Sequence, residues 1–82
     1  MSLPAPPPDQ AQLLALRIAF GARLREARRA AGLTQEELVE RAGIDRAAYS
    51  EIERGQRDAR LSTLLRIEGA LGASLDVVRK DR

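Results

Sequence analysis

Two short helical stretches lie only three residues apart near the middle of the chain, and this spacing limits the folds open to it. The first stretch ends at Gly43 and opens at Thr34 with Thr-Gln-Glu-Glu, the pattern of a capping box. The second covers residues 46–54, with Asp45 as its predicted cap and Gly55 as its end. Because the turn is short and begins with glycine, the second helix must cross the first steeply.

A longer helix is predicted before this pair, from Asp9 to Ala31, where apolar residues recur at steps of three and four. Gly32 ends it in the position of a left-handed cap. The apolar stripe comprises Leu13, Leu16, Phe20, Leu24, Ala27 and Ala31. A second, shorter stripe of Leu14 and Ile18 is also expected to need burial.

Two more helices are predicted after the pair. One runs from about Leu61 or Ser62 to Leu71, with Ser62 as the substitute cap, and a short fifth helix begins at Ser74. The expected buried side of the fourth helix comprises Leu61, Leu64, Leu65, Ile67 and Leu71. No stretch shows the alternation or the β-branched runs of a strand. The sequence therefore predicts a compact all-α domain of five helices with an extended first helix.

The chain of 82 residues has room for one small domain. Residues 1–8 contain four prolines and are expected to form a disordered arm, residues 9–78 the domain, and residues 79–82 a charged tail. The longest apolar stretch, residues 13–22, is interrupted by Arg17 and is too short to span a bilayer. We therefore expect a soluble, cytoplasmic protein with no membrane partner.

The composition excludes several kinds of chemistry. Without cysteine or histidine, the chain has no thiol nucleophile, imidazole base, disulfide or zinc site. We therefore expect that the protein is not an enzyme and that it binds no cofactor, metal or small-molecule substrate. The net charge of +2 is small, but 13 of the 14 basic residues are arginines, Lys80 being the exception. Guanidinium groups suit phosphates and base edges, although a coding bias toward arginine explains the composition equally well.

Several segments, taken in order and spacing, resemble the lambda-repressor-like, Cro/Xre-type helix-turn-helix domains over roughly residues 20–78. The matching segments are Gly21-Ala22-Arg23-Leu24-Arg25, Gly32-Leu33-Thr34-Gln35-Glu36-Glu37-Leu38, Ala42-Gly43-Ile44, Ile52-Glu53-Arg54-Gly55, Leu64-Leu65-Arg66-Ile67 and Ala70-Leu71-Gly72-Ala73-Ser74-Leu75. Two positions depart from the family pattern: Val39 replaces the usual alanine, and Ala59-Arg60 stand where a Pro-Ser pair is common.

This resemblance implies that the helix 46–54 enters the major groove of double-stranded DNA. With Tyr49 and Ile52 turned to the core, the predicted base contacts are Arg46, Ala47, Ser50 and Glu51. Glu51 could accept from a cytosine amine or be repelled by phosphate. The predicted phosphate contacts are Gln35, Arg54, Arg57 and Arg60, of which Arg60 could instead approach the minor groove or a dimer partner. Surface solubility is the competing explanation for the three arginines.

The family motif also pairs the glutamate at position 53 with an arginine of the first helix, which here corresponds to Arg28. At the end of a helix, where the dipole disfavours negative charge, a half-buried carboxylate needs such a partner. The resemblance thus implies a structural ion pair between Arg28 and Glu53.

Family members usually bind DNA as dimers, so a homodimer is expected. The candidate dimer surfaces are Leu14 and Ile18 on the first helix, or Leu75, Val77 and Val78 near the C-terminus. Leu14 and Ile18 could also pack on the fifth helix of their own chain. The expected function is a sequence-specific DNA-binding transcriptional regulator, a small repressor or controller that reads the major groove with the helix 46–54 as a dimer. One alternative stays open: a protein-interaction module of the same fold, such as a coactivator or an antitoxin, with little DNA recognition of its own.

Overall fold

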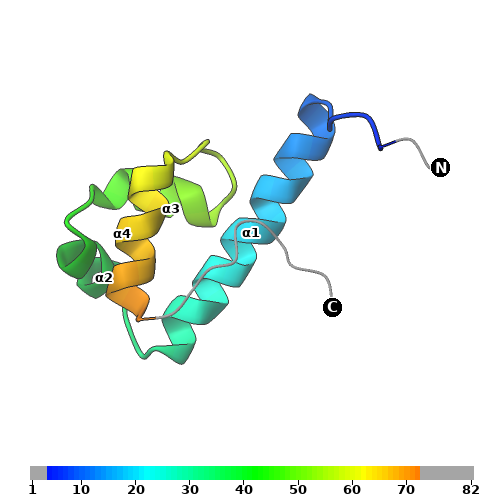
Figure 1. Cartoon of the computed structure of the whole chain (residues 1–82). Helices are drawn as coiled ribbons and strands as arrows, with labels where there is room; N and C mark the ends of the chain where they lie inside the picture. Colours follow the sequence, from blue (N-terminus) through cyan, green and yellow to red (C-terminus); the bar gives the residue numbers. More distant parts are fainter. Residues whose placement is uncertain (1–3, 73–82) are drawn as a thin grey trace.

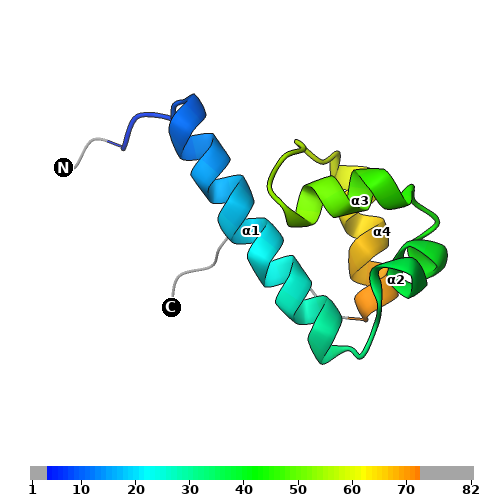
Figure 2. The same cartoon turned by 180° about the vertical axis from the view of Figure 1, so that it is seen from behind.

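The computed structural model describes residues 4–72, which form four helices and no strand. These are α1 (Gln10–Ala30), α2 (Gln35–Ala42), α3 (Arg46–Glu53) and α4 (Leu61–Leu71). Helices α2, α3 and α4 form a body, and α1 runs along one side of it with its N-terminal half projecting beyond (Figures 1 and 2). The all-α class is thus confirmed for the described residues. The predicted fifth helix and the charged tail lie outside them.

Side chains cap the N-terminal starts of the first three helices. Asp9 accepts a hydrogen bond from the backbone of Gln12 at 2.8 Å, Thr34 one from Glu37 at 3.1 Å, and Asp45 one from Ala48 at 2.9 Å. These bonds satisfy backbone N–H groups that have no partner inside the helix.

The start of α4 differs from the expectation. Arg60 occupies its N-cap position and provides no side-chain hydrogen bond to the helix. The prediction that Ser62 caps this helix is wrong, because α4 begins at Leu61 and Ser62 already lies inside its first turn.

The core lies where α2 meets α3 and α4, and it is closed on one side by the C-terminal half of α1. Its fully buried side chains include Tyr49, and the others are aliphatic. The buried hydrophobic residues are Leu24, Leu33, Leu38, Ala42, Tyr49, Ile52, Leu64 and Ile67. Because the inward side of α3 consists of Tyr49 and Ile52, its opposite side is turned to solvent.

Several leucines predicted to be buried are exposed. On α4, Leu61 and Leu65 are 65% and 56% exposed, because only a narrow face of this helix, with Leu64 and Ile67, meets α2. On α1, Leu13 and Leu16 are exposed since the helix extends beyond the body. Ala31, past the end of α1, is exposed as well. No helix within residues 4–72 combines the length and the apolar character needed to cross a membrane.

Helices α1 and α3 approach each other closely at Gly21. A β-carbon at this position would stand 2.3 Å from the backbone oxygen of Glu53 and 2.6 Å from that of Ile52. Only glycine allows such backbone contact, so Gly21 fixes how closely the end of α3 lies against α1.

Candidate nucleic-acid interface

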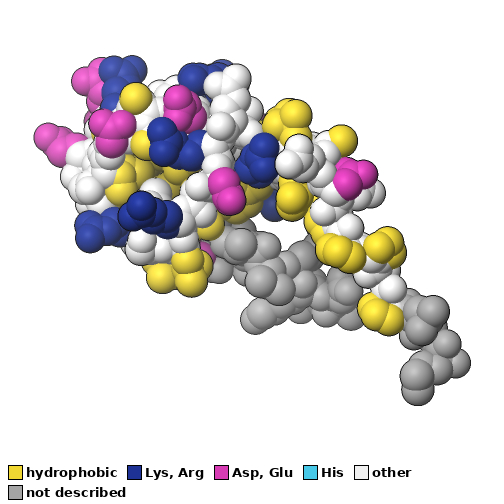
Figure 3. All heavy atoms as spheres, turned by 90° about the horizontal axis from the view of Figure 1, so that it is seen from above, with side chains coloured by type: hydrophobic (Ala, Val, Ile, Leu, Met, Phe, Trp, Pro, Cys, Tyr) yellow, Lys and Arg dark blue, Asp and Glu magenta, His cyan; other side chains and the backbone are white. Residues whose placement is uncertain are grey.

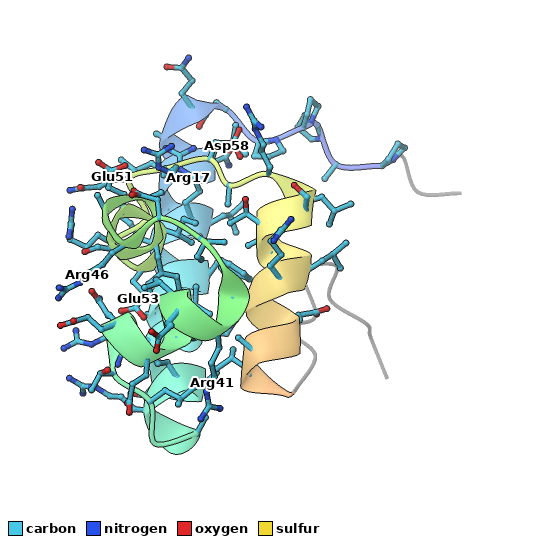
Figure 4. The ribbon with its side chains drawn as sticks, turned by 90° about the vertical axis from the view of Figure 1, so that its left-hand side faces the viewer. Arg17, Arg41, Arg46, Glu51, Glu53 and Asp58 are labelled. Carbon is cyan, nitrogen blue, oxygen red and sulfur yellow. The ribbon has the colours of Figure 1, made fainter. Side chains whose placement is uncertain are left out.

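The solvent side of α3 carries the residues predicted to contact bases. Arg46 and Ala47 are exposed at the N-terminal end of the helix, and Ser50 and Glu51 are half-buried one turn further along. In Figure 4, Arg46 and Glu51 project to the same side of the molecule, whereas Glu53 lies between the helices. The structure thus brings the four predicted base-contacting residues together on one face, which we call the α3 face.

Most charged and polar groups around the α3 face are paired with each other. Arg46 Nη1 lies 3.4 Å from Oε1 of Glu36 on α2. Arg57 binds Oε1 of Glu51 through Nε and Nη2, at 2.8 and 2.7 Å. These ion pairs are open to solvent, so each contributes little to stability. In the structure they turn the two arginines toward neighbouring carboxylates.

Arg54, at the C-terminal end of α3, is also engaged. Its Nη1 donates to Ser50 Oγ at 2.6 Å, and its Nε donates to Gln56 Oε1 at 3.2 Å. Ser50, a predicted base contact, and Arg54, a predicted phosphate contact, are therefore hydrogen-bonded to each other. Arg60 lies apart from them, exposed at the start of α4.

Gln35, predicted to contact phosphate, forms a bond inside the protein. Its Nε2 donates to Glu53 Oε1 at 3.0 Å. An amide nitrogen carries two N–H groups, so a second donor remains at the N-terminus of α2. The bond to Glu53 fixes the orientation of the amide at this end of the helix.

Behind the α3 face, Glu53 is the centre of a buried polar cluster that joins the first three helices. Arg28 Nε and Nη2 donate to its two carboxylate oxygens at 2.7 and 3.2 Å. The hydroxyl of Tyr49 donates to the same carboxylate, and Gln35 completes its set of partners. Arg28 also donates to the backbone oxygen of Leu33 at 2.8 Å. Every buried side-chain nitrogen and oxygen within the described residues has a hydrogen-bond partner.

The electrostatics of this cluster favour its charged form. Burial alone would raise the pKa of Glu53, but the hydrogen bonds from Arg28, Tyr49 and Gln35 outweigh it and hold the pKa below its ordinary value. The hydrogen bond to Glu53 raises the pKa of Arg28. Burial, followed by the contact with Glu53, raises the pKa of Tyr49, so its hydroxyl remains a donor. The ion pair is thus intact at neutral pH and ties α3 to α1.

The sequence interpretation missed a further contact of the same region. Arg17 Nε donates to the backbone oxygen of Gly55 at 3.2 Å, which joins the N-terminal half of α1 to the loop after α3. No local sequence pattern predicts a contact between two residues that are 38 positions apart. The bonds from Tyr49 to Glu53 and from Arg54 to Ser50, in contrast, have the i, i+4 spacing of helix neighbours and could have been anticipated.

Comparisons with known proteins agree with the helical fold. A family model described as helix-turn-helix matches residues 24–78. The structure resembles the restriction-modification controller protein C.AhdI from Aeromonas hydrophila, with a TM-score of 0.72 and 43% identity over 74% of this chain and 92% of that one. It also resembles a hypothetical transcription factor, NHTF, from Neisseria, with a TM-score of 0.67 and 34% identity over 90% and 82% of the two chains.

A similar sequence is the uncharacterized HTH-type transcriptional regulator YqaE of Bacillus subtilis, 36% identical over 61 residues. The match covers 74% of this chain and 53% of that protein. The chain therefore spans about half the length of the relatives of this kind.

Proposed function

The chain belongs to the Cro/Xre-type helix-turn-helix family, and on that premise we propose that it is a sequence-specific DNA-binding transcriptional regulator. This family consists of transcription regulators and not of enzymes. In the proposal, α3 enters the major groove of double-stranded DNA while α2 crosses the backbone.

One observation carries the proposal most directly: Arg46 and Ala47 are exposed at the N-terminal end of α3, while Tyr49 and Ile52 anchor the opposite side in the core. A guanidinium at this place can form two hydrogen bonds with guanine O6 and N7, which is worth about 1–3 kcal/mol of discrimination between bases. Ala47 can contact a thymine methyl group. Ser50 and Glu51 lie one turn further along and would complete the contacts to base edges.

The groups around the α3 face are suited to hold the phosphates. The second N–H of the Gln35 amide, at the positive end of α2, can donate to a phosphate oxygen. Arg54 and Arg57 flank the other end of α3, and Arg60 follows them in the loop before α4. Such contacts fix the register of the protein on the duplex, whereas the base contacts select the sequence.

We further propose that the protein binds as a homodimer. A single helix covers few base pairs, and two copies related by a two-fold axis would contact half-sites about one helical turn apart. The target is then a pseudo-palindrome.

Selection of bound sequences from a random duplex pool tests the proposal. We expect a palindromic consensus, together with an affinity that falls steeply with salt concentration because phosphate contacts release counterions. Arg46→Ala should relax the selection at one position of each half-site and weaken binding to the consensus by about 1–3 kcal/mol. The matched control is Arg41→Ala, since Arg41 is an exposed arginine at the C-terminal end of α2, away from the α3 face (Figure 4).

The family fold is also compatible with a protein-interaction module without DNA recognition, and the acidic partners Glu36 and Glu51 next to the arginines favour this alternative. A pool without enrichment, or binding that does not change with salt, would decide for it and against the proposed function.

A further inference from the structure

Arg57, in the loop after α3, reaches back to this helix and binds the side chain of Glu51. Its Nε and Nη2 both donate to Oε1 of the carboxylate, at 2.8 and 2.7 Å. Asp58 is the neighbour of Arg57 in the sequence, yet within residues 4–72 the ion pair of Arg57 is with Glu51. The second carboxylate oxygen, Oε2, accepts no hydrogen bond from these residues. One oxygen of Glu51 is therefore occupied, and the other remains an acceptor for a partner outside the chain.

The backbone turn after α3 brings Arg57 to this place. The backbone N–H of Gln56 donates to the backbone oxygen of Glu51 at 2.8 Å, across Gly55, whose φ is +73°. A bond of this span over a glycine with positive φ is typical of a Schellman ending. Arg17 Nε donates to the backbone oxygen of Gly55 at 3.2 Å, which ties the turn to α1. The position of Arg57 beside Glu51 therefore follows from the path of the backbone and does not depend on the strength of an exposed ion pair.

The pairing with Arg57 changes what the charge of Glu51 means for a DNA complex. A lone carboxylate on the α3 face would be repelled by the phosphates, whereas the ion pair carries no net charge. Figure 3 shows acidic and basic side chains next to one another over the body, so this surface has no uniform sign. The side chains of Arg57 and Glu51 are 48% and 39% exposed, and their attraction contributes little to the stability of the free protein. In a complex that excludes water the same attraction is stronger, because the effective dielectric constant is lower.

The free oxygen of Glu51 suits one base better than the others. A carboxylate only accepts hydrogen bonds, whereas Arg46 on the same face only donates them. In the major groove guanine presents two acceptors, thymine an acceptor and a methyl group, and adenine an acceptor beside its donor. Cytosine presents only a donor, its N4 amine. Cytosine is thus the base that satisfies the carboxylate without placing a second acceptor against it.

We propose that Glu51 selects cytosine through its free carboxylate oxygen, and that Arg57 is the positioning residue that neutralises Glu51 in the complex. This inference rests on the proposed function and adds to it the identity of one base. It differs from a purely repulsive role, in which Glu51 lowers the affinity for every sequence alike.

Selection from a random duplex pool, followed by competition binding with each of the four bases at every consensus position, tests the inference. The parent protein should select cytosine at one position that depends on Glu51. Glu51→Gln should lower the preference for cytosine there at least about tenfold and favour adenine, because an amide can bind adenine N6 and N7. Arg57→Ala should lower the preference at the same position, and Arg57→Lys should restore part of it because the positive charge returns.

Two control variants separate base selection from general electrostatics. Glu36→Gln removes the same charge from a carboxylate that is also paired with an exposed arginine, Arg46. Arg60→Ala removes an exposed arginine next to the same loop. Both controls should leave the preference for cytosine unchanged, whatever they do to the affinity for all sequences. Circular dichroism should show the melting temperature of the parent for Glu51→Gln and Arg57→Ala, since their ion pair is half-exposed.

The outcomes distinguish this inference from the function on which it rests. If Glu51→Gln binds every duplex more tightly with unchanged base preferences, Glu51 only repels DNA and the inference is overturned. A cytosine preference that survives Arg57→Ala, or disappears with Glu36→Gln, overturns it as well. In each of these cases the parent still has a consensus, so the proposed function stands. A parent protein that selects no consensus removes the proposed function and this inference with it.

Discussion

The buried carboxylate of Glu53 offers the sharpest test of how the α3 face is held in place. In Glu53→Gln the side chain keeps its shape but loses its charge, and one acceptor oxygen must serve Arg28, Tyr49 and Gln35, which all donate to the carboxylate in the structure. Arg28, only 8% exposed, is then a buried cation without a counterion.

Removing one member of a buried ion pair costs about 3–5 kcal/mol. A domain of this size has a free energy of unfolding of about 4–12 kcal/mol, so the loss is a large part of the total. At about 4–8 °C per kcal/mol, the melting temperature should fall by at least about 12 °C. Thermal unfolding at pH 7, followed by circular dichroism, measures this shift.

Two further variants make the result specific to the cluster. Glu40→Gln removes an exposed carboxylate from α2 and should leave the melting temperature nearly unchanged. Adding Arg28→Met to Glu53→Gln removes the uncompensated cation, so the double variant should be more stable than Glu53→Gln alone. A Glu53→Gln protein with the same melting temperature as the Glu40→Gln control would refute the structural role of the ion pair.

The remaining predictions concern stability as well. Gly21→Ala should destabilise the fold by about 1–3 kcal/mol in urea unfolding, because its methyl group would collide with the backbone of α3, whereas Gly69→Ala, which meets nothing within 4 Å, should be neutral or stabilising. Thr34→Ala should cost about 1 kcal/mol by the same measurement, since it removes the cap of α2. The lowered pKa of Glu53 means that its contribution to stability is complete above its ordinary pKa of 4.5 and is lost as the pH falls through the lower folded pKa. Unfolding free energies should therefore drop in acid, and less so in Glu53→Gln.

The part of the fold that the sequence predicts well is local. The caps at Thr34 and Asp45 bind backbone groups three residues ahead, so neighbouring residues suffice to place the helix starts. The inward side of α3 follows from the spacing of Tyr49 and Ile52. Only the resemblance to a family predicts the pairing of Arg28 with Glu53, because the two residues are 25 positions apart in the sequence.

The predictions of burial that failed depended on how the helices pack against one another. Leu65 is as apolar as the buried Leu64 and Ile67 and fits the same helical pattern. It faces solvent because α2 lies on the other side of α4. Likewise, the apolar stripe of α1 predicts one continuous buried face, but Leu13 is 42% exposed and lines an open groove with Ala59 and Leu64. Periodicity identifies an apolar face, whereas burial also requires a second surface that reaches it.

The pairing of charges around the α3 face changes what its arginines imply for DNA binding. Arg46 and Arg57 each pair with a carboxylate, that of Glu36 and that of Glu51, but each guanidinium keeps N–H groups that the ion pair does not use. The carboxylates therefore leave the arginines able to donate, and they reduce the attraction to DNA of any sequence. The net charge of +2 acts in the same direction. Affinity would then depend on base contacts that only the correct sequence provides, which is the property that a sequence-specific regulator needs most.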